Sequence, residues 1–184
     1  ILRSLKAASK LSRKISSHLL KHPTTPDLQN LMLEALDLTT NICNLTPDIS
    51  MMPETLHQSA GAVNEIWRQG LLCYVYEAIY GLTSSERRVQ ECVRLTVSAL
   101  RTMPWKQGVI WPVFMIGVQA SDADDRKVVS ASLNDVSLTL KSTNIMSTLV
   151  FLQKVWTDMD QKGTGISRWR QLMADSGTQL NLLL

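Results

Sequence analysis

Apolar residues recur at spacings of three and four along almost the whole of this 184-residue chain. Such spacing places them on one face of an α-helix, whereas a half-buried strand needs strict alternation of apolar and polar residues. We find no convincing alternating run and no Asn-Gly or Asp-Gly pair to close a hairpin. The pattern predicts an all-α fold, a multi-helix bundle of about seven to nine helices. Its clearest stripe consists of Leu28, Leu31, Ala35, Leu38, Ile42 and Leu45.

Capping residues, glycines and prolines divide this pattern into expected helices. Thr83-Ser84-Ser85-Glu86 has the spacing of a capping box, and Asn144 is a residue type that often caps a helix. The segment 109–118 is apolar on all sides, which predicts a central buried helix with Pro112 in its first turn. Other expected helices cover about 2–21, 27–45, 54–81 and 166–174, and three more carry the apolar residues of 89–100, 129–140 and 145–156.

Charge is distributed unevenly along the chain. Residues 1–22 hold six of the 19 Lys and Arg residues and none of the 16 acids, so the remaining body is slightly acidic. The basic residues fall on one face of the first expected helix, which favours either a solvated surface or contact with phosphates, a membrane surface or an acidic partner. We expect residues 1–50 to form an N-terminal helical segment and residues 51–184 to form the core domain.

The three cysteines, Cys43, Cys73 and Cys92, lie far apart in apolar surroundings. Their odd number and the absence of a CxxC pair predict buried free thiols and no zinc site or other metal site in this chain. The longest apolar stretches fall well short of the roughly 20 residues that a membrane span requires. We therefore expect no membrane partner. Because the chain begins at Ile1 rather than Met, we also expect a fragment or a processed chain.

The strongest enzymatic lead is the acidic cluster of Asp122, Asp124 and Asp125. Aspartates on a helix can hold Mg²⁺ and a diphosphate, as in all-α terpene synthases, so an enzyme of that type is one alternative. The cluster lacks the usual order of two adjacent aspartates, two spacers and a third. It is better suited to capping a helix N-terminus, where negative charge is favoured. No nucleophile motif or phosphate loop is visible either, so we expect no catalytic residues and no enzyme.

Aromatic and sulfur-containing side chains recur along the two most apolar segments. Aromatic stripes at helical spacing usually pack in a core, although the same residues could line a pocket for a small hydrophobic molecule. The candidates for such a pocket are Trp67, Tyr74, Tyr76, Trp111, Phe114 and Met115.

The segment from Ile110 to Ala120 resembles the signature of the fungal-specific transcription factor domain, in which Trp-Pro precedes Phe, Gly and Ala at fixed spacings. The resemblance covers about residues 55–170, and Val118-Gln119 stand where the family often has Cys-Glu. The residues that carry it are Trp111, Pro112, Phe114, Gly117, Ala120, Arg126 and Trp156.

The resemblance implies a helical regulatory region of a nuclear fungal transcription factor that controls RNA polymerase II transcription. It implies a hydrophobic effector and either a homodimer or contacts with the transcriptional machinery. DNA would be bound only through a zinc cluster outside this chain, and that missing module would hold the zinc, while no cofactor is expected here. A helical scaffold that only mediates assembly is a further alternative.

Overall fold

The computed structural model describes residues 1–19, 25–47, 57–103, 108–163 and 169–177. Within these ranges the chain forms eight α-helices and no strand, which confirms the predicted all-α bundle. The helices are α1 (Leu2–Leu19), α2 (Thr25–Cys43), α3 (His57–Ala78), α4 (Arg87–Thr102), α5 (Ile110–Gly117), α6 (Ala123–Leu140), α7 (Thr143–Lys162) and α8 (Trp169–Asp175). None of the described helices is long and apolar enough to cross a bilayer.

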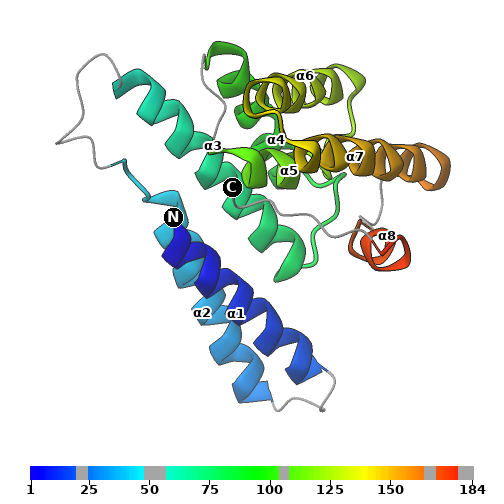
Figure 1. Ribbon diagram of the computed structural model, residues 1–184. Helices are drawn as coiled ribbons and strands as arrows, with labels where there is room; N and C mark the ends of the chain where they lie inside the picture. The colour runs from blue at the N-terminus through cyan, green and yellow to red at the C-terminus, as the bar shows by residue number, and fades with distance from the viewer. Residues whose placement is uncertain (20–24, 48–56, 104–107, 164–168, 178–184) are drawn as a thin grey trace.

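α1 and α2 pair as a helical hairpin alongside α3 (Figure 1). The hairpin buries one apolar face of α1, on which Ala8, Leu11 and Ile15 lie. The α2 stripe is buried at its four central positions and half-buried at its two ends. The basic residues of α1 remain exposed on the opposite face, as the spacing predicted. Residues 20–24, which include His22, lie outside the described ranges.

The buried side chains form two hydrophobic clusters that meet on α3. The first cluster joins α1 and α2 to α3 and to the N-terminal part of α4. The second joins α5, α6 and α7 to the C-terminal end of α4, with Ile66 of α3 among its buried members. α3 therefore connects the hairpin to the rest of the bundle. The division into 1–50 and 51–184 stays a prediction.

The central apolar segment forms α5, and seven of its eight residues are buried. Pro112 is the third residue of this helix, so it lies in the first turn as predicted. A proline is tolerated in that turn because the N–H groups there have no partner within the helix.

Two predicted helix caps are wrong. α4 begins at Arg87 with Glu86 as its N-cap residue, and the Thr83 hydroxyl pairs with Ser85 in the preceding turn rather than with the helix. The N-cap residue of α7 is Ser142, and Asn144 lies inside the first turn. In both places a capping residue type lies a few residues from the observed start, and the sequence alone did not show which residue leaves helical geometry.

The cysteines are free, but they do not share one environment. Cys73 and Cys92 are buried as predicted, and burial raises the pKa of both thiols, that of Cys92 to about 12. Cys43 is exposed at the end of α2, which contradicts the prediction that all three are buried. It lies next to the inward-facing Ile42, so the helix turns its side chain away from α3.

Candidate functional site

The start of α5 crosses α3 at very short range. A Cβ atom built on Gly70 would lie 2.4 Å from Cβ of Pro112 and 2.7 Å from its Cα. No side chain fits in that space, so a glycine on α3 is what allows the backbone of α5 to approach. A glycine inside a helix lowers the stability of that helix, and this close approach is the reason for the presence of Gly70.

The C-terminal end of α5 is held by side chains from other helices. The indole Nε1 of Trp156 on α7 donates to the carbonyl oxygen of Gly117 over 2.8 Å. A Cβ atom on Gly117 would lie 2.9 Å from Leu152, so this glycine also allows α7 to approach. The last carbonyls of a helix lack partners within it, and buried ones need a donor from elsewhere.

Arg126 of α6 holds the segment that follows this end. Its Nε donates to the carbonyl oxygen of Ala120 over 2.9 Å, and one terminal nitrogen lies 2.9 Å from each carboxylate oxygen of Asp160. Its guanidinium also lies over the ring of Trp156, 5.7 Å from the centroid. We call Gly117, Ala120, Arg126, Trp156 and Asp160 the α5 clasp. Four of the seven residues that carry the resemblance therefore meet in space.

Sequence reasoning missed Asp160, although a signal was present. Asp160 follows Trp156 by four residues, so the two lie on one face of α7. Gly117, Ala120, Arg126 and Trp156 are four of the residues that carry the resemblance. Each donates or accepts a hydrogen bond at the buried end of α5 or just beyond it, so each has a structural task.

Three of the predicted pocket residues form an aromatic cluster between α3 and α5. The rings of Trp67 and Trp111 stack with centroids 5.6 Å apart and planes inclined by 14°. Tyr74 lies against Trp111 at 6.0 Å. The Trp67 indole Nε1 donates to the carbonyl oxygen of Gly108 just before α5. All three rings are partly exposed, so they are accessible at the surface of the bundle.

The other predicted pocket residues lie in different surroundings. Phe114 and Met115 are each 1 % exposed and belong to the second hydrophobic cluster. Phe114 contacts the edge of Trp169, with centroids 5.4 Å apart, and so connects the cluster to α8. Tyr76 lies apart, against Tyr80. A ligand pocket at Trp67, Tyr74, Trp111, Phe114 and Met115 stays a prediction.

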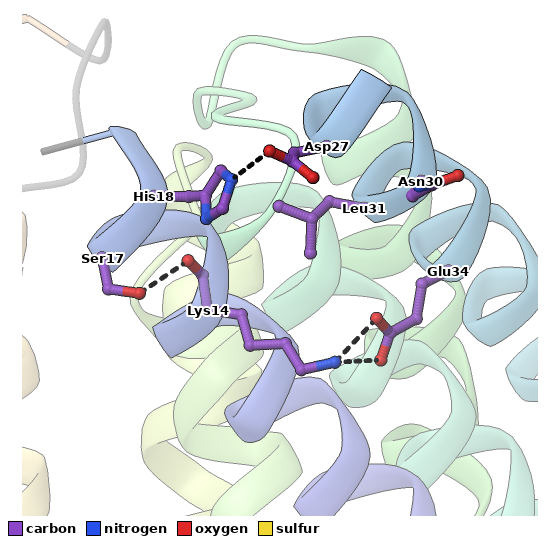
Figure 2. A pocket seen from close by; sticks show the side chains of 7 residues that line it. All are labelled: Lys14, Ser17, His18, Asp27, Asn30, Leu31 and Glu34. Carbon is purple, nitrogen blue, oxygen red and sulfur yellow. Dashed lines mark hydrogen bonds and ion pairs between the residues drawn. The ribbon is translucent and has the colours of Figure 1, made fainter. Parts of the chain in front are cut away.

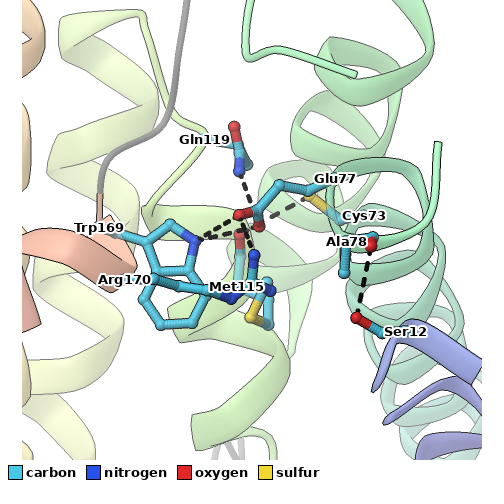
Figure 3. A network of polar contacts seen from close by, with 8 residues as sticks. All are labelled: Ser12, Cys73, Glu77, Ala78, Met115, Gln119, Trp169 and Arg170. Carbon is cyan, nitrogen blue, oxygen red and sulfur yellow. Dashed lines mark hydrogen bonds and ion pairs between the residues drawn. The ribbon is translucent and has the colours of Figure 1, made fainter. Parts of the chain in front are cut away.

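Glu77 is the centre of a polar network beside these aromatic rings (Figure 3). Its side chain is only 9 % exposed. The carboxylate accepts from the indole Nε1 of Trp169 at 2.9 and 3.0 Å and from Arg170 at 2.7 Å. Gln119, which is fully buried, donates to it from 3.4 Å. Three elements therefore converge on one acid: α3, the end of α5, and α8.

Burial raises the pKa of Glu77 from its ordinary value, while Arg170, Trp169 and Gln119 act in the opposite direction. The Arg170 guanidinium also lies over two rings, 4.6 Å from the centroid of Trp169 and 5.6 Å from that of Tyr74. Sequence reasoning did not select Glu77 or Arg170. The available signal was a single acid directly after an apolar run of α3.

The acidic cluster serves as a helix cap. Oδ1 of Asp122 accepts from the backbone N–H groups of Asp124 and Asp125 at 2.8 and 3.3 Å, and Asp124 forms an ion pair with Lys127. This confirms the interpretation of the cluster as the N-terminal cap of α6. Within the described residues, no group of three or more His, Cys, Asp or Glu side chains could hold a metal ion.

A small open pocket of about 310 Å³ lies between α1 and α2 (Figure 2). Two polar pairs line it: Lys14 forms an ion pair with Glu34 at 2.9 Å, and the His18 Nε2 lies 3.5 Å from the Asp27 carboxylate. All four of these side chains are substantially exposed, so the pairs add little stability. They bring the charges of the two helices together across the hairpin. One of the basic groups of α1 is therefore paired within the chain.

The outer face of α2 is apolar. A groove of about 550 Å³ is lined by Leu28, Gln29, Met32, Leu33 and Leu36. Leu33 and Leu36 are 60 % and 57 % exposed. Exposed apolar surface of this kind is typical of protein contacts.

A family model described as the fungal specific transcription factor domain matches residues 1–183. The match confirms the resemblance drawn from the 110–120 segment and extends it over the N-terminal hairpin. No curated protein and no solved structure matches the chain.

The crossing of α3 and α5 yields a test with a matched control. We expect Gly70→Ala to destabilise the chain by about 1–3 kcal/mol, because the added methyl group overlaps Pro112. Gly61→Ala on the same helix meets no atom within 4 Å and should stabilise it by about 0.5–1 kcal/mol. Urea unfolding measures both. Equal effects of the two substitutions would contradict the close crossing.

The environment of Glu77 predicts a pH dependence. Because burial raises its folded-state pKa above the ordinary value of a glutamic acid, the folded chain binds a proton more readily than the unfolded chain. The stability contributed by this group is therefore complete at low pH and is lost as pH rises through the raised pKa. We expect the free energy of unfolding of the wild type, relative to Glu77→Gln, to fall over that window. A difference independent of pH would contradict the burial of this carboxylate.

Proposed function

This chain belongs to the family of fungal-specific transcription factor domains, so its role lies in the regulation of transcription, and we propose that it is the regulatory and protein-interaction region of a zinc-cluster transcription factor. The protein would act in the nucleus on RNA polymerase II transcription. The observation that carries the proposal is the match of the family over residues 1–183, together with the α5 clasp built from its signature residues.

The residues of this chain do not fit a zinc cluster. Cys43 is exposed at the end of α2, while Cys73 and Cys92 are buried in the first hydrophobic cluster. The described residues contain no group that could hold a metal ion. Zinc and the recognition of DNA therefore belong, in this proposal, to a module outside these residues. The chain itself would contribute regulation and contacts with other proteins, which the exposed apolar face of α2 supports.

The aromatic cluster supports the second part of the proposal, the sensing of a hydrophobic effector. Trp67, Tyr74 and Trp111 present partly exposed rings at the crossing of α3 and α5. A ligand that binds one arrangement of these helices better than another would shift the population towards it. The effect would reach the rest of the chain through α3, which contributes to both hydrophobic clusters.

The regulatory role can be tested in the full-length protein. We expect Gly70→Ala to change transcription of a target reporter while DNA binding by the purified full-length protein is retained. The matched Gly61→Ala variant should leave the reporter unchanged, since it fits the structure. Unchanged transcription with Gly70→Ala, or a full-length sequence without a six-cysteine zinc-cluster segment, would contradict the proposal.

The effector role has its own measurement. A screen of hydrophobic small molecules should find one that raises the melting temperature of the chain, because a ligand that binds only the folded state stabilises it. Trp111→Ala should remove the shift, whereas Leu138→Ala, on an 80 % exposed residue of α6, should keep it. A shift that survives Trp111→Ala would place the ligand elsewhere, and a screen without any shift would count against an effector.

A further inference from the structure

α8 is attached to the bundle by few contacts. It has seven residues, none of them buried. An isolated helix of this length is not stable in water, so its position depends on the side chains that contact the body. Trp169 packs its ring edge on Phe114 and donates to Glu77, and Arg170 pairs with the same carboxylate. Leu172 and Met173 add partly buried apolar contacts.

Glu77 in turn depends on α8. Its two shortest partners, Trp169 and Arg170, both come from that helix, and Gln119 lies farther away at 3.4 Å. Removing α8 would take away the indole and the guanidinium that contact the Glu77 carboxylate and would uncover this group. The uncovered carboxylate could then accept hydrogen bonds from another positively charged donor.

The geometry selects one kind of cation. The Arg170 guanidinium donates to the Glu77 carboxylate while lying over the rings of Trp169 and Tyr74. A planar guanidinium can stack on a ring and donate from its edge at the same time, whereas an ammonium group is a compact, strongly hydrated charge. The ring of Phe114 accommodates a flat aromatic group in perpendicular contact beside it.

We propose that Glu77, Tyr74 and Phe114 form a recognition site for a guanidinium group carried next to an aromatic ring, and that Trp169 and Arg170 of α8 occupy this site in the same chain. An external ligand of that chemistry competes with α8 and displaces it. The ligand is either a small arginine-like molecule or an arginine-bearing segment of a polypeptide. This recognition site would give the proposed regulatory role a ligand. The biological role of the site rests on that proposed function, whereas the binding itself does not.

Occupation by α8 lowers the affinity of the intact chain for such a ligand. The apparent dissociation constant rises in inverse proportion to the fraction of molecules in which the site is open. A tethered occupant competes at a high effective concentration, so the closed state dominates until a tight ligand arrives. α8 therefore acts as an intramolecular competitor and sets the affinity that a ligand needs in order to displace it.

The test uses the full chain with its internal occupant removed by the double substitution Trp169→Ala and Arg170→Ala. The probes are a capped peptide with the sequence of residues 169–175 and N-acetyl-arginine amide. Isothermal titration calorimetry measures their binding, and circular dichroism establishes that each variant is folded. If the double variant does not fold, Arg170→Ala alone is used, with ethylguanidinium as a further probe, because it should restore the melting temperature that this substitution lowers.

We expect the peptide to bind the emptied variant roughly tenfold more tightly than the wild type, because α8 competes only in the wild type. Adding Glu77→Gln to the emptied variant should weaken binding by about tenfold or more, as should a peptide with lysine in place of arginine. Binding of N-acetyl-arginine amide would identify a small molecule as a sufficient source, and binding of the peptide alone would identify a polypeptide. Both results support the site.

Three results would overturn the inference. They are equal affinity of the peptide for the wild type and the emptied variant, affinity unaffected by Glu77→Gln, and no binding or thermal rescue by any probe. These readings come from the purified chain, so they are independent of the reporter assay. A failure here would leave the transcriptional role untouched, and a failure of that role would leave the binding measurement valid.

Discussion

The buried end of α5 is the constraint on which the rest of the bundle depends. This helix is apolar and enclosed, so its last carbonyl groups cannot be hydrated. Trp156 donates to the carbonyl of Gly117, Arg126 donates to that of Ala120 just beyond the helix, and glycines at positions 70 and 117 allow the neighbouring helices to come close enough. Hydrophobic burial thus requires specific polar side chains from α6 and α7. Both side chains are among the residues on which the resemblance to the family was drawn.

Glu77 is a second buried polar group that receives its hydrogen-bond donors from other parts of the chain, but these donors are held less firmly. At the clasp, the donors belong to two long helices that are fixed by their own buried stripes. At Glu77, the main donors belong to a short helix with no buried residue. Because the Glu77 carboxylate is paired by a weakly held helix, the position of α8 is linked to the charge of Glu77. Because of this difference, we interpret the α5 clasp as structural and Glu77 as the proposed site at which an external ligand replaces α8.

Sequence periodicity was sufficient for the helices and their buried faces, because a spacing of three and four residues is a local property. It placed the stripe of α2, the central helix and the basic surface of α1 correctly. The caps at Thr83 and Asn144 were wrong because a cap depends on which residue leaves helical geometry. The pairing of Glu77 with Arg170, 93 residues later, could not be predicted from spacing at all.

The position of α3 between the two hydrophobic clusters has a consequence for how such chains can diverge. Ser12 of α1 donates to the carbonyl of Ala78, one residue after Glu77, so both halves of the chain contact the same turn of α3. A helix enclosed from two sides has few positions at which a substitution leaves the packing unchanged. The outer faces of α1 and α2 have many. New binding preferences can therefore accumulate on the hairpin surface, while the buried turns of α3 retain a nearly fixed set of side chains.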